Sequence, residues 1–244
     1  MSTGKTEGPR FSLKDVPFRD GTGRGVRIAI VDSGVAAGHP HVGGVIGGAR
    51  IMAEGEDDDF ADRLGHGTAV AAAIREKAPD AEFLAVRIFD RELATTASVL
   101  ARGIEWATAA GAQIINVSLG TANPAHAERF SRAVQLASDA GAVVVAAATN
   151  EGQLVWPGAL ADVIGVEAVW DGARDVLGVE ARPNGGLLLR ASAFPRPIPG
   201  VPTERNLQGV SFAVANATGF LARLCDATPS AGTLARLREA LMRD

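Results

Sequence analysis

The feature that most constrains the fold is a series of short apolar runs separated by helical patterns. The runs are Arg27–Asp32, Phe83–Phe89, Gln113–Leu119, Ala142–Ala148 and Val163–Val169. They are almost continuously apolar rather than alternating, as strands covered on both faces are. We therefore expect these segments to form the buried strands of one central sheet, beginning with Arg27–Asp32.

Helical patterns lie between and after these runs. They cover Thr68–Glu76, Ala97–Ala110, Ala125–Ala140, Phe212–Leu224 and Thr233–Met242. Gly111 and Gly141 stand where helix-ending glycines are expected. Strands that alternate with helices predict right-handed crossovers and a mostly parallel sheet flanked by helices, an α/β fold.

The segment Asp171–Pro202 breaks this pattern with glycine, proline and arginine, and it predicts an antiparallel hairpin followed by surface loops. The chain contains no internal repeat and no linker. We therefore expect residues 1–244 to form a single domain.

Composition narrows the class of protein. The 244 residues carry a net charge of −4, which gives no argument for a nucleic-acid or membrane partner. The single cysteine, Cys225, excludes an intrachain disulfide. The polar N-terminus lacks the apolar segment of a signal peptide, so we expect a cytoplasmic protein.

Four polar residues follow apolar runs or open helices, where sites of parallel α/β proteins form. Asp32 ends a strand, His66 lies between two glycines, Ser211 opens a helix and Asn150 follows a strand. Each also has a structural interpretation: Asp32 and Asn150 as turn residues, His66 and Ser211 as helix caps. Asp, His and Ser in this chain order match one known order of a catalytic triad.

The surrounding motifs make the match specific, and the chain resembles the subtilisin-like serine peptidases. The resemblance runs from about Gly25 to the C-terminus. It is carried by Val31–Val35 with His39-Pro40, Gly65–Ala71, Gly103–Ala107, Ile115–Gly120, Val143–Ala148, Asn150–Gly152, Trp156–Gly158 and Gly209–Ala215.

The resemblance implies a subtilisin-like three-layer fold and a serine endopeptidase that needs no cofactor. Ser211 would be the nucleophile, His66 the general base and acid, and Asp32 the residue that orients His66. The Asn150 side chain and the Ser211 backbone N–H would bind the oxyanion.

The resemblance also implies where a peptide or protein substrate binds. Ser118, Leu119 and Gly120 would form an edge to which the substrate adds as an extended strand. Leu64 is a candidate for the adjacent subsite. Val155 would stand near the base of the primary specificity pocket, where relatives often have glycine, and this predicts a preference for small or medium residues before the scissile bond.

Three departures from the family pattern keep a second interpretation open. Val210 stands where threonine usually precedes the nucleophile, Thr149 where glycine usually precedes the oxyanion asparagine, and Ala215-Asn216 where Pro-His is usual. A catalytically weak or inactive relative could instead bind peptides in the same groove. A nucleotide-binding α/β protein is disfavoured, because no G-x-G-x-x-G or Walker motif follows Arg27–Asp32.

Metal binding is not expected. His39, His41 and His126 lack metal-ligand spacing, and the loop that supplies calcium ligands in many relatives is absent after His66. The acidic run Glu54–Asp59 is interpreted as a solvated loop, with a cation site or a rim for basic peptides as alternatives. A compact peptidase without a long preceding segment favours limited processing, such as leader removal from a precursor peptide.

Overall fold

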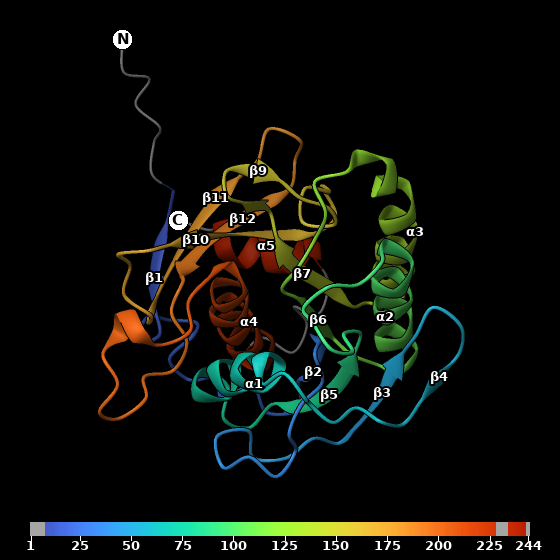
Figure 1. Cartoon of the computed structure of the whole chain (residues 1–244). Helices are drawn as coiled ribbons and strands as arrows, with labels where there is room; N and C mark the ends of the chain where they lie inside the picture. The colour runs from blue at the N-terminus through green and yellow to red at the C-terminus, as the bar shows by residue number, and fades with distance from the viewer. Residues whose placement is uncertain (1–7, 228–233, 243–244) are drawn as a thin grey trace.

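The computed structural model describes residues 8–227 and 234–242, which build one large sheet with helices on both faces (Figure 1). The strands of the large sheet are β1 (Arg10–Ser12), β2 (Arg27–Asp32), β3 (Gly47–Ile51), β4 (Glu56–Asp57), β5 (Glu82–Arg87), β6 (Ile114–Val117), β7 (Val143–Ala147), β10 (Ile164–Val169), β11 (Val176–Ala181) and β12 (Leu187–Ser192). The helices are α1 (His66–Lys77), α2 (Ala97–Ala109), α3 (Ala127–Asp139), α4 (Val210–Ala227) and α5 (Leu234–Met242).

The strand order is β1-β11-β12-β10-β7-β6-β2-β5-β3-β4. All pairings from β3 across to β12 are parallel. Strands β1, β11 and β4 pair antiparallel at the two edges. The predicted mostly parallel α/β sheet is therefore confirmed.

Two hydrophobic layers cover the sheet, and they explain why the central strands read as continuous apolar runs. In β2, Ile28 and Ile30 face the layer that holds α1 and α4, whereas Ala29 and Val31 face the layer that holds α2 and α3. Successive side chains point to opposite faces of a strand, so both sets must be apolar when both faces are covered. This is the three-layer arrangement expected.

The predicted helices are present, with ends shifted by a few residues. Gly111 and Gly141 both adopt positive φ, 77° and 79°, directly after the last residues of α2 and α3. The left-handed conformation at a helix end favours glycine, so these two stop signals are confirmed. Thr233, the expected first residue of the last helix, lies outside the described residues.

Two edge elements were not predicted. The expectation that Arg27–Asp32 is the first strand was wrong, because Arg10–Ser12 forms β1 and pairs antiparallel with β11. Strand β3 (GGARI) lacks an apolar run, and its glycines allow close approach: a Cβ on Gly48 would lie 2.3 Å from the Ala85 carbonyl oxygen. The predicted hairpin within Asp171–Pro202 is β11 and β12, and β12 also joins the parallel sheet through β10.

Within residues 8–227 and 234–242, each helix is too short or too polar to cross a lipid bilayer.

One buried cation lies at the end of α1. The Lys77 side chain is 3% exposed, with Nζ 4.0 Å from Glu76 Oε2, and it packs over Gly219 of α4. Burial and the nearby Arg174 charge lower the pKa of Lys77 to about 7, against the opposing effect of Glu76. The folded state therefore disfavours the charged amine.

Lys77→Met is expected to raise the melting temperature at pH 6. An unfolded lysine keeps a pKa near 10.5, so between about pH 7 and 10.5 the unfolded chain binds more protons and stability rises with pH. The variant should lose that rise and gain roughly 2–4 °C per kcal/mol recovered. Thermal melts from pH 6 to 10 test this, with the exposed-residue variant Lys14→Met as control. An unchanged pH profile in Lys77→Met would show that the amine is charged in the folded protein.

Candidate active site

The three predicted triad residues come from elements that meet at one edge of the sheet. Asp32 is the last residue of β2, His66 the first of α1 and Ser211 the second of α4. Helices α1 and α4 lie side by side on the same face of the sheet (Figure 1). Their N-terminal ends therefore lie near the carboxyl end of β2.

Asp32 is fully buried and holds the His66 ring. Its Oδ1 lies 2.7 Å from His66 Nδ1, and its Oδ2 accepts a hydrogen bond from Ser118 Oγ at 2.8 Å. A carboxylate only accepts, so Nδ1 carries the proton and the Nε2 lone pair of the neutral ring is left for chemistry. Ser118, expected as a substrate-edge residue, also holds Asp32.

Asp62 and Ser33 fix the first turn of α1, and neither was predicted as a site residue. The first helical N–H groups need acceptors. Gly67 N donates to Ser33 Oγ at 2.9 Å, and Thr68 N donates to Asp62 Oδ2 at 2.9 Å. Ser33 Oγ in turn donates to Asp62 Oδ1 at 2.9 Å. An aspartate shortly before Gly-His-Gly-Thr is a capping signal that could have indicated this role.

The surroundings of His66 favour its protonated form overall. Burial is the largest effect and acts against the charge, but the hydrogen bond and charge of Asp32 and the charge of Asp62 outweigh it. The pKa of His66 is therefore raised above 6.5.

If His66 is the general base, kcat/KM should rise with pH through a midpoint above 6.5, because only the neutral ring accepts a proton. Asp62→Asn removes one charge that raises this pKa, so its midpoint should lie lower than that of the unmodified protein. Asp139→Asn, on the far helix α3, makes the same charge change and should not move the midpoint. A midpoint that is equal in all three proteins would exclude His66 as the titrating group.

Ser211 faces the same cavity as His66, but its hydroxyl has another partner. Ser211 Oγ donates to the Ser118 carbonyl oxygen at 3.3 Å. Of the two contacts expected for His66, the structure contains the one to Asp32. In a substrate-free site the nucleophile–base contact is often long. Phe212, which follows Ser211, packs its ring 5.8 Å from the His66 ring and was not predicted.

The shared cavity has a volume of about 280 Å³. Its lining includes most of the predicted site residues: His66, Ser118, Leu119, Gly120, Asn150, Val155 and Ser211. Leu64 is not among the lining residues and is 37% exposed, while its N–H donates to Asp62 Oδ1 at 2.9 Å. Phe89 and Leu93 line the cavity instead. The structure thus brings together all the predicted site residues except Leu64 in and around one cavity.

Asn150 is presented by a small hairpin of β8 (Thr149–Asn150) and β9 (Gln153–Leu154). The two turn residues, Glu151 and Gly152, have positive φ of 50° and 79°, as tight two-residue hairpins require. Thr149 lines a neighbouring cavity and not the catalytic one. Its side chain therefore leaves the wall of the catalytic cavity free.

Asn216, another departure from the family pattern, has a structural task. Its Nδ2 donates to the carbonyl oxygens of Ser192 and Phe194, at 2.9 and 3.0 Å. These bonds tie α4 to the end of β12, on a face remote from the catalytic hydroxyl.

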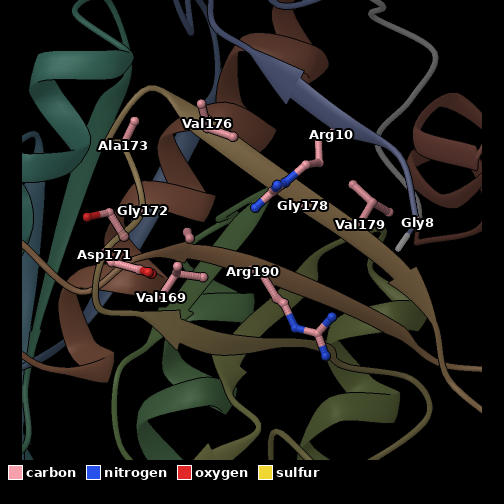
Figure 2. Close-up of a pocket in the computed structure, with 12 residues that line it drawn as sticks. Gly8, Arg10, Val169, Asp171, Gly172, Ala173, Val176, Gly178, Val179 and Arg190 are labelled. Atoms are coloured by element: carbon pink, nitrogen blue, oxygen red, sulfur yellow. The ribbon is translucent and has the colours of Figure 1, made fainter. Parts of the chain in front are cut away.

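A second cavity, of about 340 Å³, lies over the antiparallel edge of the sheet (Figure 2). Arg190 and Arg10 project from its strands, but none of the predicted site residues lines it. Arg190 is paired with Glu167 and Glu180, at 3.2 and 2.7 Å. Its charge is thus compensated, and the cavity is not the catalytic site.

The acidic run before α1 is only partly solvated, so the solvated-loop interpretation was incomplete. Glu54 and Asp58 are exposed as expected. Asp57 instead accepts from Arg50 Nε at 3.1 Å, and Asp59 pairs with the buried Arg87 at 2.9 Å. Nowhere in residues 8–227 and 234–242 do three or more His, Cys, Asp or Glu side chains gather closely enough to hold a metal ion.

Comparison with known proteins extends the geometric match. The model of the Subtilase family (Peptidase_S8) matches residues 23–193, which include Asp32, His66 and Asn150 but end before Ser211. Subtilisin DY of Bacillus licheniformis is 32% identical over 185 residues, which are 72% of this chain. The chain spans 64% of the length of Subtilisin DY and 36% of that of Subtilisin E from Bacillus subtilis.

Two solved structures show the same fold. Sphericase superposes with a TM-score of 0.70 at 23% identity, covering 97% of this chain and 90% of its own. The prenylagaramide maturation protease PagA superposes with a TM-score of 0.65 at 25% identity, covering 88% and 81%.

Proposed function

The chain belongs to the subtilase family, and on that premise we propose that it is a serine endopeptidase that hydrolyses peptide bonds through an acyl-enzyme. The observation that carries the proposal is the 2.7 Å contact between Asp32 and His66, beside a cavity that Ser211 and Asn150 also line. Each of the three side chains has an alternative structural role alone, but a capping or turn role does not require them to converge.

The geometry supports a two-step acyl transfer. Ser211 Oγ attacks the scissile carbonyl carbon as His66 Nε2 removes its proton, and the carbonyl π electrons move onto oxygen. Asn150 Nδ2 and the Ser211 backbone N–H donate to that oxyanion. When it collapses, the C–N bond breaks and His66 gives its proton to the leaving amine. Water then repeats the sequence and releases the acid.

The edge after β6 supports an extended substrate. Thr121 and Trp156 exchange two backbone hydrogen bonds of 2.9 Å, which hold the segment after Gly120 in an extended form. The Ser118–Gly120 backbone can then pair with a substrate strand. Phe89 and Leu93 add apolar surface to the cavity on which the acyl part of the substrate would rest.

Limited processing of a peptide or protein precursor is the finer part of the proposal. PagA, whose fold this chain shares, is a maturation protease for prenylagaramide. That role belongs to PagA. It supports the same class of reaction here, the removal of a segment from a precursor.

A fluorophosphonate probe tests the proposal, because it reacts with a serine only where a base and an oxyanion hole activate that residue. We expect covalent labelling at Ser211, located by mass spectrometry of the digested protein. The alternative, an inactive peptide-binding relative, predicts no labelling together with measurable binding of extended peptides. Labelling at a different serine would overturn the assignment of the nucleophile.

Val155→Gly is expected to shift specificity towards large residues before the scissile bond. Val155 is buried in the cavity wall, and its Cβ would lie 3.2 Å from a Cβ on Gly120, so it limits the depth of the cavity. Removing an isopropyl group should raise the preference for phenylalanine over alanine about tenfold or more. Competition assays with peptide libraries measure it. A dominant large aromatic preference in the unmodified protein would contradict the role given to Val155.

A further inference from the structure

A third cavity, of about 460 Å³, begins beside the catalytic histidine. It is bounded by the segment after β2, by one face of α1 and by the segment that connects β12 to α4. Gly65, directly before His66, belongs to its wall, and so does Leu207, four residues before Ser211. The cavity is therefore continuous in sequence with both catalytic side chains, although it lies outside the cavity that they share.

Small side chains on α1 leave this space open. Ala69 and Ala72 are spaced by three residues, so they lie on one face of the helix and form the floor of the cavity. Across from them, Ile198 is 50% exposed and Leu207 is 52% exposed. Apolar surface of this kind gains free energy when a ligand covers it.

The one carboxylate in the wall is already satisfied. Asp62 Oδ1 accepts from Ser33 Oγ, Leu64 N and Gly65 N, and Oδ2 accepts from Thr68 N and Thr68 Oγ1. Asp62 therefore has little capacity left for a cationic ligand, and apolar chemistry dominates the cavity. The neighbouring cavity beside Asn150 is different, because Thr149, Glu151 and Glu167 line it.

The reaction places the leaving half of a substrate next to this space. The acyl half rests along Ser118–Gly120, and His66 must face the leaving nitrogen to protonate it. The chain after the scissile bond therefore departs past His66, towards the first turn of α1 and the Leu207 segment.

We propose that this cavity binds a large aliphatic or aromatic side chain of the substrate, one to three residues after the scissile bond. The inference rests on the proposed peptidase function and adds a specificity determinant to it. A substrate cleaved here would carry its recognition element partly in the released C-terminal fragment, as cleavage at one defined position in a precursor requires.

Matched peptides test the inference. They share one acyl half and carry leucine or serine at the first, second or third position after the scissile bond. We expect leucine at one of these positions to raise kcat/KM about tenfold or more. Ala69→Leu fills the cavity and should bring the leucine-to-serine ratio close to one.

Two further variants guard against misfolding as an explanation. Leu207→Ser removes one apolar wall without adding volume, so it should lower the same ratio. Leu136→Ser, at an exposed apolar position on α3, should keep the full leucine preference. Melting temperatures of all three variants show whether each is folded.

Binding of fluorescent C-terminal fragments separates this inference from the proposed function. Tighter binding of leucine fragments, lost in Ala69→Leu, supports the cavity assignment even if no peptide is cleaved and no serine is labelled. Cleavage with equal rates for leucine and serine peptides would overturn it while leaving the peptidase function intact. A leucine preference that survives in Ala69→Leu and Leu207→Ser would also overturn it, since another part of the protein would then be the determinant.

Discussion

Ser211→Ala is expected to lower kcat by about 10⁶-fold while the protein stays folded. Loss of the nucleophile costs about that much in subtilisin, because the remaining triad members cannot act without it. The only hydrogen bond in which the structure shows the Ser211 hydroxyl is with the Ser118 carbonyl, so its loss should cost only about 1 kcal/mol of stability. Turnover of a fluorogenic peptide and a thermal melt measure the two effects.

Ser98→Ala is the matched control for this variant. Ser98 is the second residue of α2, as Ser211 is the second residue of α4, but it lies outside the catalytic cavity. It should retain full turnover. Normal turnover in Ser211→Ala would mean that another residue is the nucleophile, and the mechanism would then be wrong.

Asn150→Ala is expected to lower kcat by about 10²–10³-fold with little change in KM. That is the cost of losing one oxyanion-hole donor in subtilisin. The charge on the oxyanion develops only in the transition state, so the missing hydrogen bond affects the chemical step and leaves ground-state binding largely unchanged. Steady-state kinetics with a peptide substrate separate the two parameters.

Gln153→Ala controls for the shape of the hairpin. Gln153 faces Asn150 across the β8–β9 pair and does not line the catalytic cavity. If both variants lose activity equally, the hairpin rather than the Asn150 amide is responsible. If Asn150→Ala instead raises KM and keeps kcat, the amide binds the substrate and not the oxyanion.

Much of the catalytic arrangement could be predicted because its signals are local. Asp32 ends an apolar strand, His66 stands between glycines at a helix start, and Ser211 opens a helix of small residues. The carboxyl ends of parallel strands and the following helix starts share one edge of a sheet, so residues at these places converge whatever the loops do.

Residues whose role depends on distant partners could not be predicted in the same way. Asp62 bonds Ser33 across 29 residues, and Phe212 meets His66 only because α1 and α4 pack together. Leu64 precedes His66 closely in sequence, yet the bonds that Asp62 makes to this turn leave its side chain in solvent. Short spacing to a catalytic residue does not decide the direction of a side chain.

The sequence by itself determined the layered α/β fold and the order of its catalytic residues. Apolar runs with β-branched residues must be covered on both faces, and glycines with positive φ end α2 and α3 wherever the chain later goes. Only the tertiary structure decided the edge strand β1, which pairs with β11 across more than half of the chain, and the apolar cavity beside α1. A cavity is the space left between elements that are distant in sequence, so its existence and its chemistry appear only when those elements are packed.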